Sequence, residues 1–450
     1  YGPFMQFSTQ RELRKKMYMA YNTRCCRDNK TSNIAICKRI INLQRELAQL
    51  LGYKTYADYV MRHRMASNTR NVYRFLNKLI AAYKPAALKE IAEIKAMQQD
   101  LEPWDLAFVS HKLQLKKFNV DSEMLRPYLQ LENVIKGVFG LATMLYGITF
   151  RENKQIPVYH KDVKAYEVFD KDGSYLAVLY ADFYPREGKQ AGAWMTSFQG
   201  QYINSKRENI RPHVSLVMNF TKPLHGKPSL LTLGEVETFL HEFGHALHGI
   251  FANTEYECLS GTNVWWDFVE LPSQFMENYA AEKEFLQTFA FHHETGEVMP
   301  DVLIRRIVRS RNFNAATACL RQVSFGLLDM AYYTLTEPLA EDLRTFEDRA
   351  WAPTQLMERV PESCMTVQFG HIMSGGYAAG YYSYKWAEVL DADAFAAFKE
   401  EGLFNKDTAA RFRRELLSKG NTREPMDLYV AFRGRKPNIN ALLQRDGIKQ

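Results

Sequence analysis

This sequence has few cysteines, no long apolar run and no large excess of charge of one sign. Each of these features excludes a class of protein. Only 6 of the 450 residues are cysteines, and they are irregularly spaced, so neither a disulfide framework nor a four-cysteine zinc module is expected. The most apolar uncharged run, residues 137–150, is shorter than the roughly 20 residues of a membrane-spanning helix and predicts a buried helix instead. The small number of cysteines favours a reducing, cytoplasmic compartment.

The charges are nearly balanced. The 58 basic and 51 acidic residues leave a net charge of +7, which is mild for this length, and no block rich in Lys and Arg is interleaved with aromatic residues. We therefore expect no nucleic-acid partner, no membrane partner and a monomer. The chain begins with Tyr1 rather than methionine, so we expect a fragment, and a periplasmic location would follow if a signal segment had been removed.

The composition that remains, 46% hydrophobic and 24% charged residues, is that of an ordinary globular protein. Residues 1–154 carry helical periodicity, residues 155–223 carry strand patterns, and helical patterns return over residues 224–450. The predicted fold is mainly α with one small β-sheet, and the three regions are expected to form one continuous unit.

Individual elements can be placed within these regions. Asn68 is a candidate N-cap for a helix, and Pro85 is expected to kink or divide that helix. The apolar stripe of this helix consists of Val72, Phe75, Leu76, Leu79 and Ile80. Further along, two strands are expected to form a hairpin around a polar turn, and two more strands follow. The four expected strands are 165–169, 175–183, 192–198 and 214–220.

The most informative segment is a helix expected over residues 232–249. Thr232 and Glu235 have the spacing of a capping box at its start, and Gly249 is expected to end it.

Two histidines on this helix, His241 and His245, are four residues apart and therefore lie on one face, as two imidazoles that bind one ion must. Glu242 projects about 100° round from His241, where it can take a proton from a metal-bound water. This is the H-E-x-x-H signature of zinc hydrolases. The competing interpretation is a helix that carries three histidines for packing alone.

Catalytic zinc needs a third protein ligand. His248 and Phe251 stand where the variant with a third histidine requires Gly and His, so that variant is excluded. A carboxylate from a later helix is the alternative. Glu270 is preferred on spacing, but Glu277 lies seven residues further on the same helical face, and Glu270 could instead form a capping box with Asp267. The remaining carboxylates are candidates for orienting the histidines.

Several motifs together resemble the thimet oligopeptidase family of zinc metallopeptidases. They are His-Glu-Phe-Gly-His-Ala-Leu-His at 241–248, Ser-Gly-Thr at 260–262, the Asp-Phe-Val-Glu-Leu-Pro-Ser-Gln segment at 267–274, and the Gly- and Tyr-rich segment at 370–384. Within the family the resemblance is greatest to the bacterial peptidyl-dipeptidases, through residues 102–105, 192–195, 219–223 and 389–395.

This resemblance covers essentially the whole chain and implies a zincin-like metallopeptidase with helical lobes around a deep substrate channel. It implies one Zn²⁺ ion held by His241, His245 and Glu270, with Glu242 as the general base. Members of the family carry a further helical N-terminal portion, so the chain is expected to be a C-terminal catalytic portion.

The segment 370–380 contains four glycines and is expected to be a mobile loop. By resemblance, Tyr381 and Tyr384 stabilise the oxyanion and bind substrate, Tyr377 binds substrate, and His371 is the family's loop histidine. Taken singly, each tyrosine could equally be a buried aromatic residue with a polar tip.

We also expect the substrate to pair with a sheet edge at Gly192 and Ala193, whose small side chains allow close approach.

The expected function is zinc-dependent hydrolysis of short, unstructured peptides that releases dipeptides from a free C-terminus. An endo-acting oligopeptidase of the same family is the alternative, and a non-catalytic peptide-binding homologue is the alternative from another class. The sequence does not indicate which basic residue would bind the substrate's C-terminus.

Three weaker candidates for a functional site are set aside. His292-His293-Glu294 is expected at the surface, Cys25-Cys26 are expected to be idle thiols, and Gly375-Gly376 is not followed by a phosphate-loop lysine.

Overall fold

The computed structural model describes residues 1–224 and 226–448. The chain forms two compact units, each assembled from separate segments. Unit 1 comprises Tyr1–Asn119, Asn312–Trp386 and Leu443–Gln450, and unit 2 comprises Val120–Arg311 and Ala387–Leu442. Each unit thus contains segments from more than one of the three regions expected from the sequence. None of the helices among the described residues is both long and apolar enough to cross a membrane.

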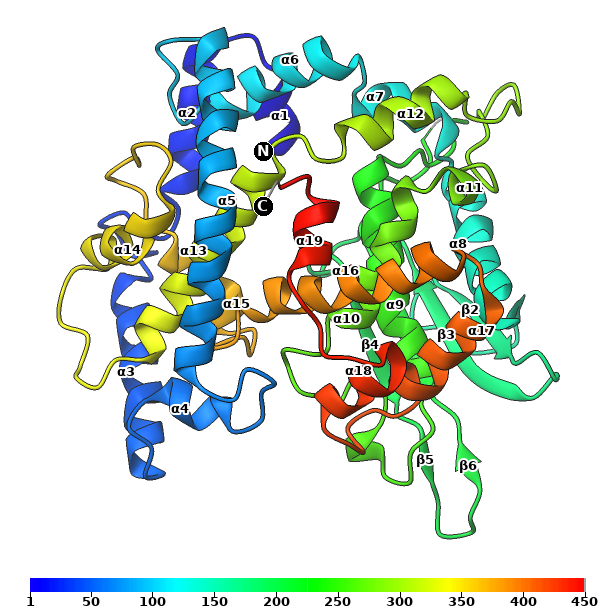
Figure 1. The fold of residues 1–450 in the computed structure, drawn as a ribbon. Helices are drawn as coiled ribbons and strands as arrows, with labels where there is room; N and C mark the ends of the chain where they lie inside the picture. The colour runs from blue at the N-terminus through cyan, green and yellow to red at the C-terminus, as the bar shows by residue number, and fades with distance from the viewer. Residues whose placement is uncertain (225, 449–450) are drawn as a thin grey trace. The chain divides into compact units, whose positions relative to one another are not determined.

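Unit 1 is helical. Its two longest helices, α5 and α13, lie side by side (Figure 1). Its helices are α1 (Gly2–Phe7), α2 (Arg11–Asn22), α3 (Ile34–Leu50), α4 (Tyr56–Met61), α5 (Thr69–Met97), α6 (Leu106–Phe118), α13 (Ala315–Tyr333), α14 (Leu343–Trp351) and α15 (Gly370–Met373). Two further helices include residues of both units, α16 (Ser383–Glu401) and α19 (Asn440–Arg445).

Helix α5 continues through Pro85, so of the two expected effects, a kink or a division, the division does not occur. Asn68 caps the helix as predicted, because its side chain accepts a hydrogen bond from a backbone N–H of the first turn. Buried residues line the helix on both sides of the proline, Val72 before it and Ala87 and Ile91 after it. Packing along the whole length, mainly against α13, offsets the hydrogen bond that proline removes.

Unit 2 contains a five-stranded sheet of order β1-β2-β3-β7-β4, so β4 is an edge strand. β3 and β7 pair in parallel and the other neighbours are antiparallel. The predicted hairpin and the two further strands are confirmed, whereas β1 and the small β5–β6 sheet were not anticipated. The strands are β1 (Thr149–Glu152), β2 (Lys164–Phe169), β3 (Tyr175–Asp182), β4 (Trp194–Gln199), β5 (Tyr202–Ile203), β6 (Asn209–Ile210) and β7 (His213–Val217).

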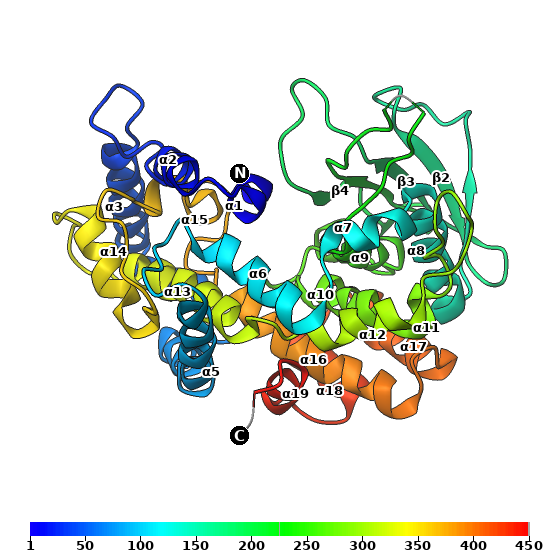
Figure 2. The same cartoon turned by 90° about the horizontal axis from the view of Figure 1, so that it is seen from above.

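Helices complete unit 2. They are α7 (Ser122–Leu125), α8 (Leu131–Tyr146), α9 (Leu233–Ile250), α10 (Leu271–Glu277), α11 (Lys283–Leu286), α12 (Asp301–Ser310), α17 (Lys406–Phe412), the π-helical segment η6 (Arg413–Leu417) and α18 (Pro425–Arg433). The apolar run at 137–150 is only partly helical, because α8 ends at Gly147, whose φ of +76° is left-handed, and β1 follows. Helix α9 lies between the sheet and α10 (Figure 2).

The two ends of α9 can be compared with those of the helix predicted over residues 232–249. The capping box is confirmed: the Glu235 N–H donates to Thr232 Oγ1 at 3.1 Å, and the Thr232 N–H donates to Glu235 Oε2 at 2.7 Å. The predicted end at Gly249 was wrong, because α9 continues to Ile250. Gly249 serves close packing instead, since a Cβ there would lie 2.9 Å from Met195 Cε on β4.

Gly244 has the corresponding role on the other side of α9. A Cβ at this position would lie 2.3 Å from the carbonyl oxygen of Pro272 in the first turn of α10. Only glycine therefore lets the two helices approach this closely.

We expect Gly244→Ala to lower the free energy of unfolding of unit 2 by about 1–3 kcal/mol, because α10 must move away from α9. Urea unfolding monitored by circular dichroism would measure the change. Gly234→Ala in the first turn of α9 is the matched control. The nearest atom to its new Cβ is Thr232 Oγ1 at 4.0 Å, so we expect a gain of about 0.5–1 kcal/mol. A loss at position 234 equal to that at 244 would contradict the close-packing argument.

Candidate metal centre

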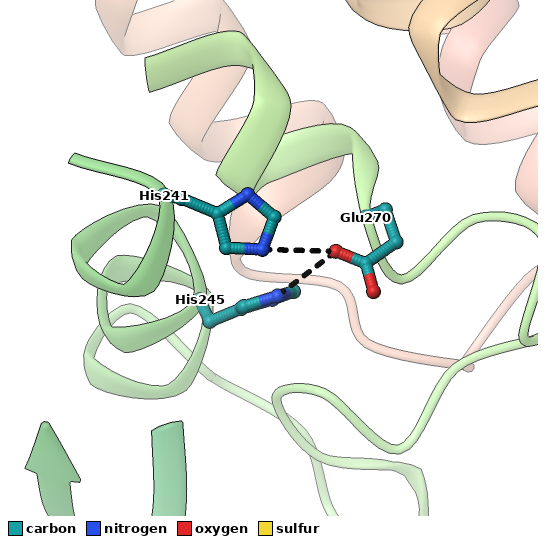
Figure 3. A group of neighbouring side chains, drawn as sticks. All are labelled: His241, His245 and Glu270. Atoms are coloured by element: carbon teal, nitrogen blue, oxygen red, sulfur yellow. Dashed lines mark hydrogen bonds and ion pairs between the residues drawn. The ribbon is translucent and has the colours of Figure 1, made fainter. Parts of the chain in front are cut away.

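Three side chains predicted to share a metal ion converge in unit 2 (Figure 3). Glu270 Oε2 lies 3.3 Å from His241 Nε2 and 3.1 Å from His245 Nε2. The ligand atoms of all three residues lie within 4.8 Å of one another. Two imidazoles and a carboxylate form the donor set of many catalytic zinc sites, in which ligands about 2.0–2.2 Å from the ion surround one position. The residues present therefore fit a divalent metal ion.

The position of Glu270 follows from the start of α10. Glu270 is the residue immediately before this helix and is its N-cap, so Asp267 does not have the N-cap position that the capping-box alternative requires. Ser273 Oγ instead donates to Glu270 Oε2 at 3.0 Å and to the Glu270 carbonyl oxygen at 2.9 Å. These two contacts hold the carboxylate toward the histidines.

The electrostatics of this group are dominated by burial and pairing. Only 3% of Glu270 is exposed. Burial alone would raise its pKa, but the charge of His245 and hydrogen bonds from both histidines hold the pKa well below its usual range. Burial would likewise lower the pKa of His241, but Glu270 and Glu277 raise that pKa well above its usual value.

Glu277, the other carboxylate that the spacing allowed, contacts a different atom. Its Oε1 lies 2.5 Å from His241 Nδ1, whereas Glu270 faces the Nε2 atoms of both histidines. A carboxylate on the far nitrogen fixes the ring orientation and tautomer of a metal-binding histidine. The geometry thus gives Glu270 and Glu277 distinct positions that sequence spacing could not separate.

His248, the third histidine of α9, is not part of the group whose ligand atoms converge. It is fully buried, and burial lowers its pKa to about 3. Its ring is therefore neutral and belongs to the packing of the helix.

Glu242 lies next to the histidines and is 6% exposed. Burial is the largest influence and raises its pKa, against the lowering effect of His241 and His245. The backbone of Met195 on edge strand β4 is a further influence that lowers the pKa of Glu242. A raised pKa suits a carboxylate that must exchange a proton near neutral pH.

Gly192 and Ala193 directly precede β4. The φ of Gly192 is +100°, and a Cβ there would meet nothing within 4 Å, so backbone conformation rather than crowding requires glycine. Asn219 Nδ2 donates to the Gly192 carbonyl oxygen at 2.7 Å, so this acceptor already has a partner.

The four predicted site residues of the Gly- and Tyr-rich segment belong to unit 1 and form one aromatic cluster. The His371 ring centroid lies 5.7 Å from Tyr377, 5.5 Å from Tyr381 and 6.1 Å from Tyr384. Tyr377 and Tyr384 stack at 5.1 Å.

Tyr381 differs from its neighbours in the cluster. Its hydroxyl donates to Gln322 Oε1 at 2.9 Å, and burial raises its pKa to about 12. Tyr384 is only half-buried.

Sequence reasoning missed Asp329, which anchors this segment. Its carboxylate accepts hydrogen bonds from the backbone N–H groups of Ala379 at 2.8 Å and Tyr381 at 2.9 Å. Burial raises its pKa to about 7 in spite of these bonds. The segment is also not loop throughout, since it begins with α15. A lone aspartate inside the apolar run Phe-Gly-Leu-Leu-Asp-Met-Ala at 325–331 was the available signal.

The rejected His292-His293-Glu294 cluster lacks metal-binding geometry. The two rings stack against each other at 5.3 Å. Within residues 1–224 and 226–448, the group of His241, His245 and Glu270 is the one arrangement of such side chains close enough to hold an ion.

We expect Glu277→Gln to weaken the binding of Zn²⁺ by about 10- to 100-fold, because the histidine loses the charge that orients it. A competition titration against a chromogenic chelator would measure the affinity. Glu294→Gln, a charge removed from the rejected cluster, should leave the affinity unchanged. Equal affinities for the wild type and Glu277→Gln would show that Glu277 has no orienting role.

Comparison with known proteins agrees with this geometry. Residues 4–448 match Peptidase family M3. The chain is 39% identical over 469 residues to oligopeptidase A of Escherichia coli (strain K12), covering 100% of this chain and 68% of the relative. It is 37% identical over 455 residues to dipeptidyl carboxypeptidase of the same organism, covering 99% and 66%, and 31% identical over 473 residues to saccharolysin of Saccharomyces cerevisiae, covering 99% and 65%. The greater resemblance to peptidyl-dipeptidases expected from the motifs is thus not reflected in overall identity.

Solved structures confirm the fold class. A structure described as PZ peptidase A with inhibitor 2 aligns with a TM-score of 0.59 at 16% identity, covering 99% of this chain and 69% of that one. The M32 carboxypeptidase from Deinococcus radiodurans R1 aligns with a TM-score of 0.56 at 13% identity, covering 97% and 76%. The predicted zincin-like fold, mainly α with a small sheet, is therefore confirmed. The chain belongs to peptidase family M3, the thimet oligopeptidase family of metallopeptidases.

Proposed function

We propose that the chain is a zinc-dependent peptidase that hydrolyses short, unstructured peptides. The convergence of His241 Nε2, His245 Nε2 and Glu270 Oε2, with Glu242 beside them, carries this proposal. One bound zinc ion would supply Lewis acidity and lower the pKa of water to about 7.

The chain's own residues divide the remaining work. His241, His245 and Glu270 hold the ion, and Glu277 keeps the His241 ring in orientation. Glu242 takes a proton from the attacking water and returns it to the leaving amine. Its burial supports this role, because a carboxylate with a raised pKa can both accept and release a proton near neutral pH.

For the oxyanion of the scissile carbonyl we propose Tyr384 as the principal hydrogen-bond donor. The engagement of the Tyr381 hydroxyl with Gln322 supports a positioning role for Tyr381 in the aromatic cluster. His371 and Tyr377 complete that cluster and would act through contacts with Tyr384 and with substrate.

The substrate would add as a strand to the free edge of β4, beside Gly192 and Ala193. The edge position of β4 in the sheet and its packing against α9, the helix that carries Glu242, support this placement.

The finer proposal is that the enzyme releases dipeptides from a free C-terminus. Similarity to dipeptidyl carboxypeptidase supports it, while the slightly higher identity to oligopeptidase A favours internal cleavage as the alternative. The presence of Glu242 and all three proposed ligands weighs against a non-catalytic homologue. We also propose that it acts as a monomer on peptides alone, in the cytoplasm, or in the periplasm if a leader has been removed.

We expect Glu242→Gln to lower kcat by about 10²- to 10⁴-fold, because the general base is lost while the three ligands remain. Steady-state hydrolysis of a quenched fluorescent peptide and metal analysis of the same samples would test this. Glu284→Gln, at an exposed position of α11, is the control and should retain full turnover. Near-normal turnover of Glu242→Gln with zinc bound would contradict the assignment of Glu242 as the general base.

The mode of cleavage can be read from products. Mass spectrometry would follow one N-blocked peptide of eight residues, once with a free and once with an amidated C-terminus. We expect stepwise loss of dipeptides from the free form only, because recognition of a terminal carboxylate requires its charge. Internal cuts in both forms would establish the oligopeptidase alternative, and cleavage of neither would contradict the peptidase proposal.

A further inference from the structure

A cavity of about 350 Å³ lies beside edge strand β4 in unit 2. Its walls come from β4, from the turn that follows it, from the end of α9 and from the segment 257–263. Most of the side chains that line it are polar and uncharged, among them Thr196, Ser197, Gln201, Ser260 and Thr262. The size is at the lower end of the range for small-ligand sites and suits one amino-acid side chain.

The cavity is next to the metal centre within the same unit. Gly249 lines it and follows His245 by one turn of α9, which is about 6 Å along the helix. Met195, which also lines it, lies on β4, which packs against α9, the helix that carries Glu242. An extended peptide advances about 3.3 Å per residue. A peptide on the edge of β4 would therefore place a side chain in the cavity about two residues from the bond that is cut.

Three glycines allow close packing in the walls of the cavity. A Cβ on Gly249 would crowd Met195 Cε at 2.9 Å, and a Cβ on Gly261, whose φ is +56°, would lie 3.3 Å from the Gly249 Cα. A Cβ on Gly200 would lie 2.7 Å from Glu257 Cγ. Glycine at position 200 thus lets the Glu257 side chain fold over the turn and into the cavity wall.

Glu257 gives the cavity its charge. It is the one charged residue among the described residues that line the cavity. Its Oε1 accepts a hydrogen bond from the Gly200 N–H at 2.9 Å, and within the described part of the chain it makes no ion pair. Glu255, two residues earlier, differs because it pairs with Arg207 Nη1 at 2.5 Å.

An aromatic ring completes the arrangement. Phe198 lines the cavity and is 59% exposed. The Phe198 ring also makes edge contacts with Tyr159 and Tyr180, at 5.6 and 5.5 Å between ring centroids. A carboxylate and an exposed aromatic side chain that line one cavity can recognise an ammonium or guanidinium group, by ion pairing and by the cation–π interaction, while the ring covers the methylene stem.

We infer that this cavity is a specificity subsite for a basic side chain of the peptide, Lys or Arg, with Glu257 as its counter-ion. The inference rests on the proposed peptidase function, and it names a substrate preference that the metal centre alone does not define.

The zinc-loaded chain would be tested with peptides that differ at one position only, carrying Lys, norleucine or Glu two residues to either side of the cleaved bond. Mass spectrometry would verify the bond that is cut. We expect kcat/KM for Lys to exceed that for norleucine about tenfold at one of the two positions, as a charge-assisted contact provides. Glu257→Gln, which keeps an acceptor for the Gly200 N–H, should bring this ratio near one. Glu257→Lys should favour the Glu peptide.

Glu255→Gln is the matched control, because it removes the same charge from the same segment but from a residue paired with Arg207. It should keep the wild-type ratio. Equal Lys and norleucine rates in the wild type, or a ratio that Glu257→Gln leaves intact, would overturn the subsite.

A binding measurement separates the subsite from the peptidase proposal. In the Glu242→Gln background, fluorescence anisotropy would give Kd for the same peptides without turnover. A Lys preference there that Glu257→Gln removes would support the subsite even if the wild type cleaved nothing. Equal Kd values for Lys and norleucine would reject the subsite even if the wild type cleaved both peptides.

Discussion

The close approach of α10 to α9 is the constraint on which the metal centre depends. Gly244 presents no side chain where the Pro272 carbonyl oxygen passes, so the start of α10 reaches the backbone of α9. Glu270, the residue just before α10, can then place its carboxylate oxygen 3.1–3.3 Å from the two histidines. With a larger residue at position 244 the helices would separate, and the carboxylate would withdraw from the histidines it faces.

In this packing the pKa values of two carboxylates shift in opposite directions. Glu270 is buried against two imidazoles, which hold its pKa down, whereas the burial of Glu242 raises its pKa. Such a divergence is how one site keeps one carboxylate ionised while another exchanges protons. Edge strand β4 packs against α9, so the proton-exchanging Glu242 and the proposed substrate strand belong to neighbouring elements.

Several of the confirmed predictions concern short-range order. The capping box at Thr232, the N-cap at Asn68 and the hairpin of β2 and β3 each depend on hydrogen bonds between residues close in sequence. Two of the differences concern positions where distant segments meet. Helix α5 continues through Pro85, where α13 packs along it. Gly249 lies inside α9 rather than at its end, where β4 packs closely against the helix.

The sequence by itself determined that His241 and His245 share one helical face, with Glu242 beside them, because the period of the α-helix alone places them. Its spacing left open whether Glu270 or Glu277 faces the histidines, although the family resemblance implied Glu270, and it gave no sign of the cavity around Glu257. Only the tertiary structure decided these points. Helical spacing orders side chains along one element, whereas the atom that a carboxylate contacts depends on how closely two helices pack.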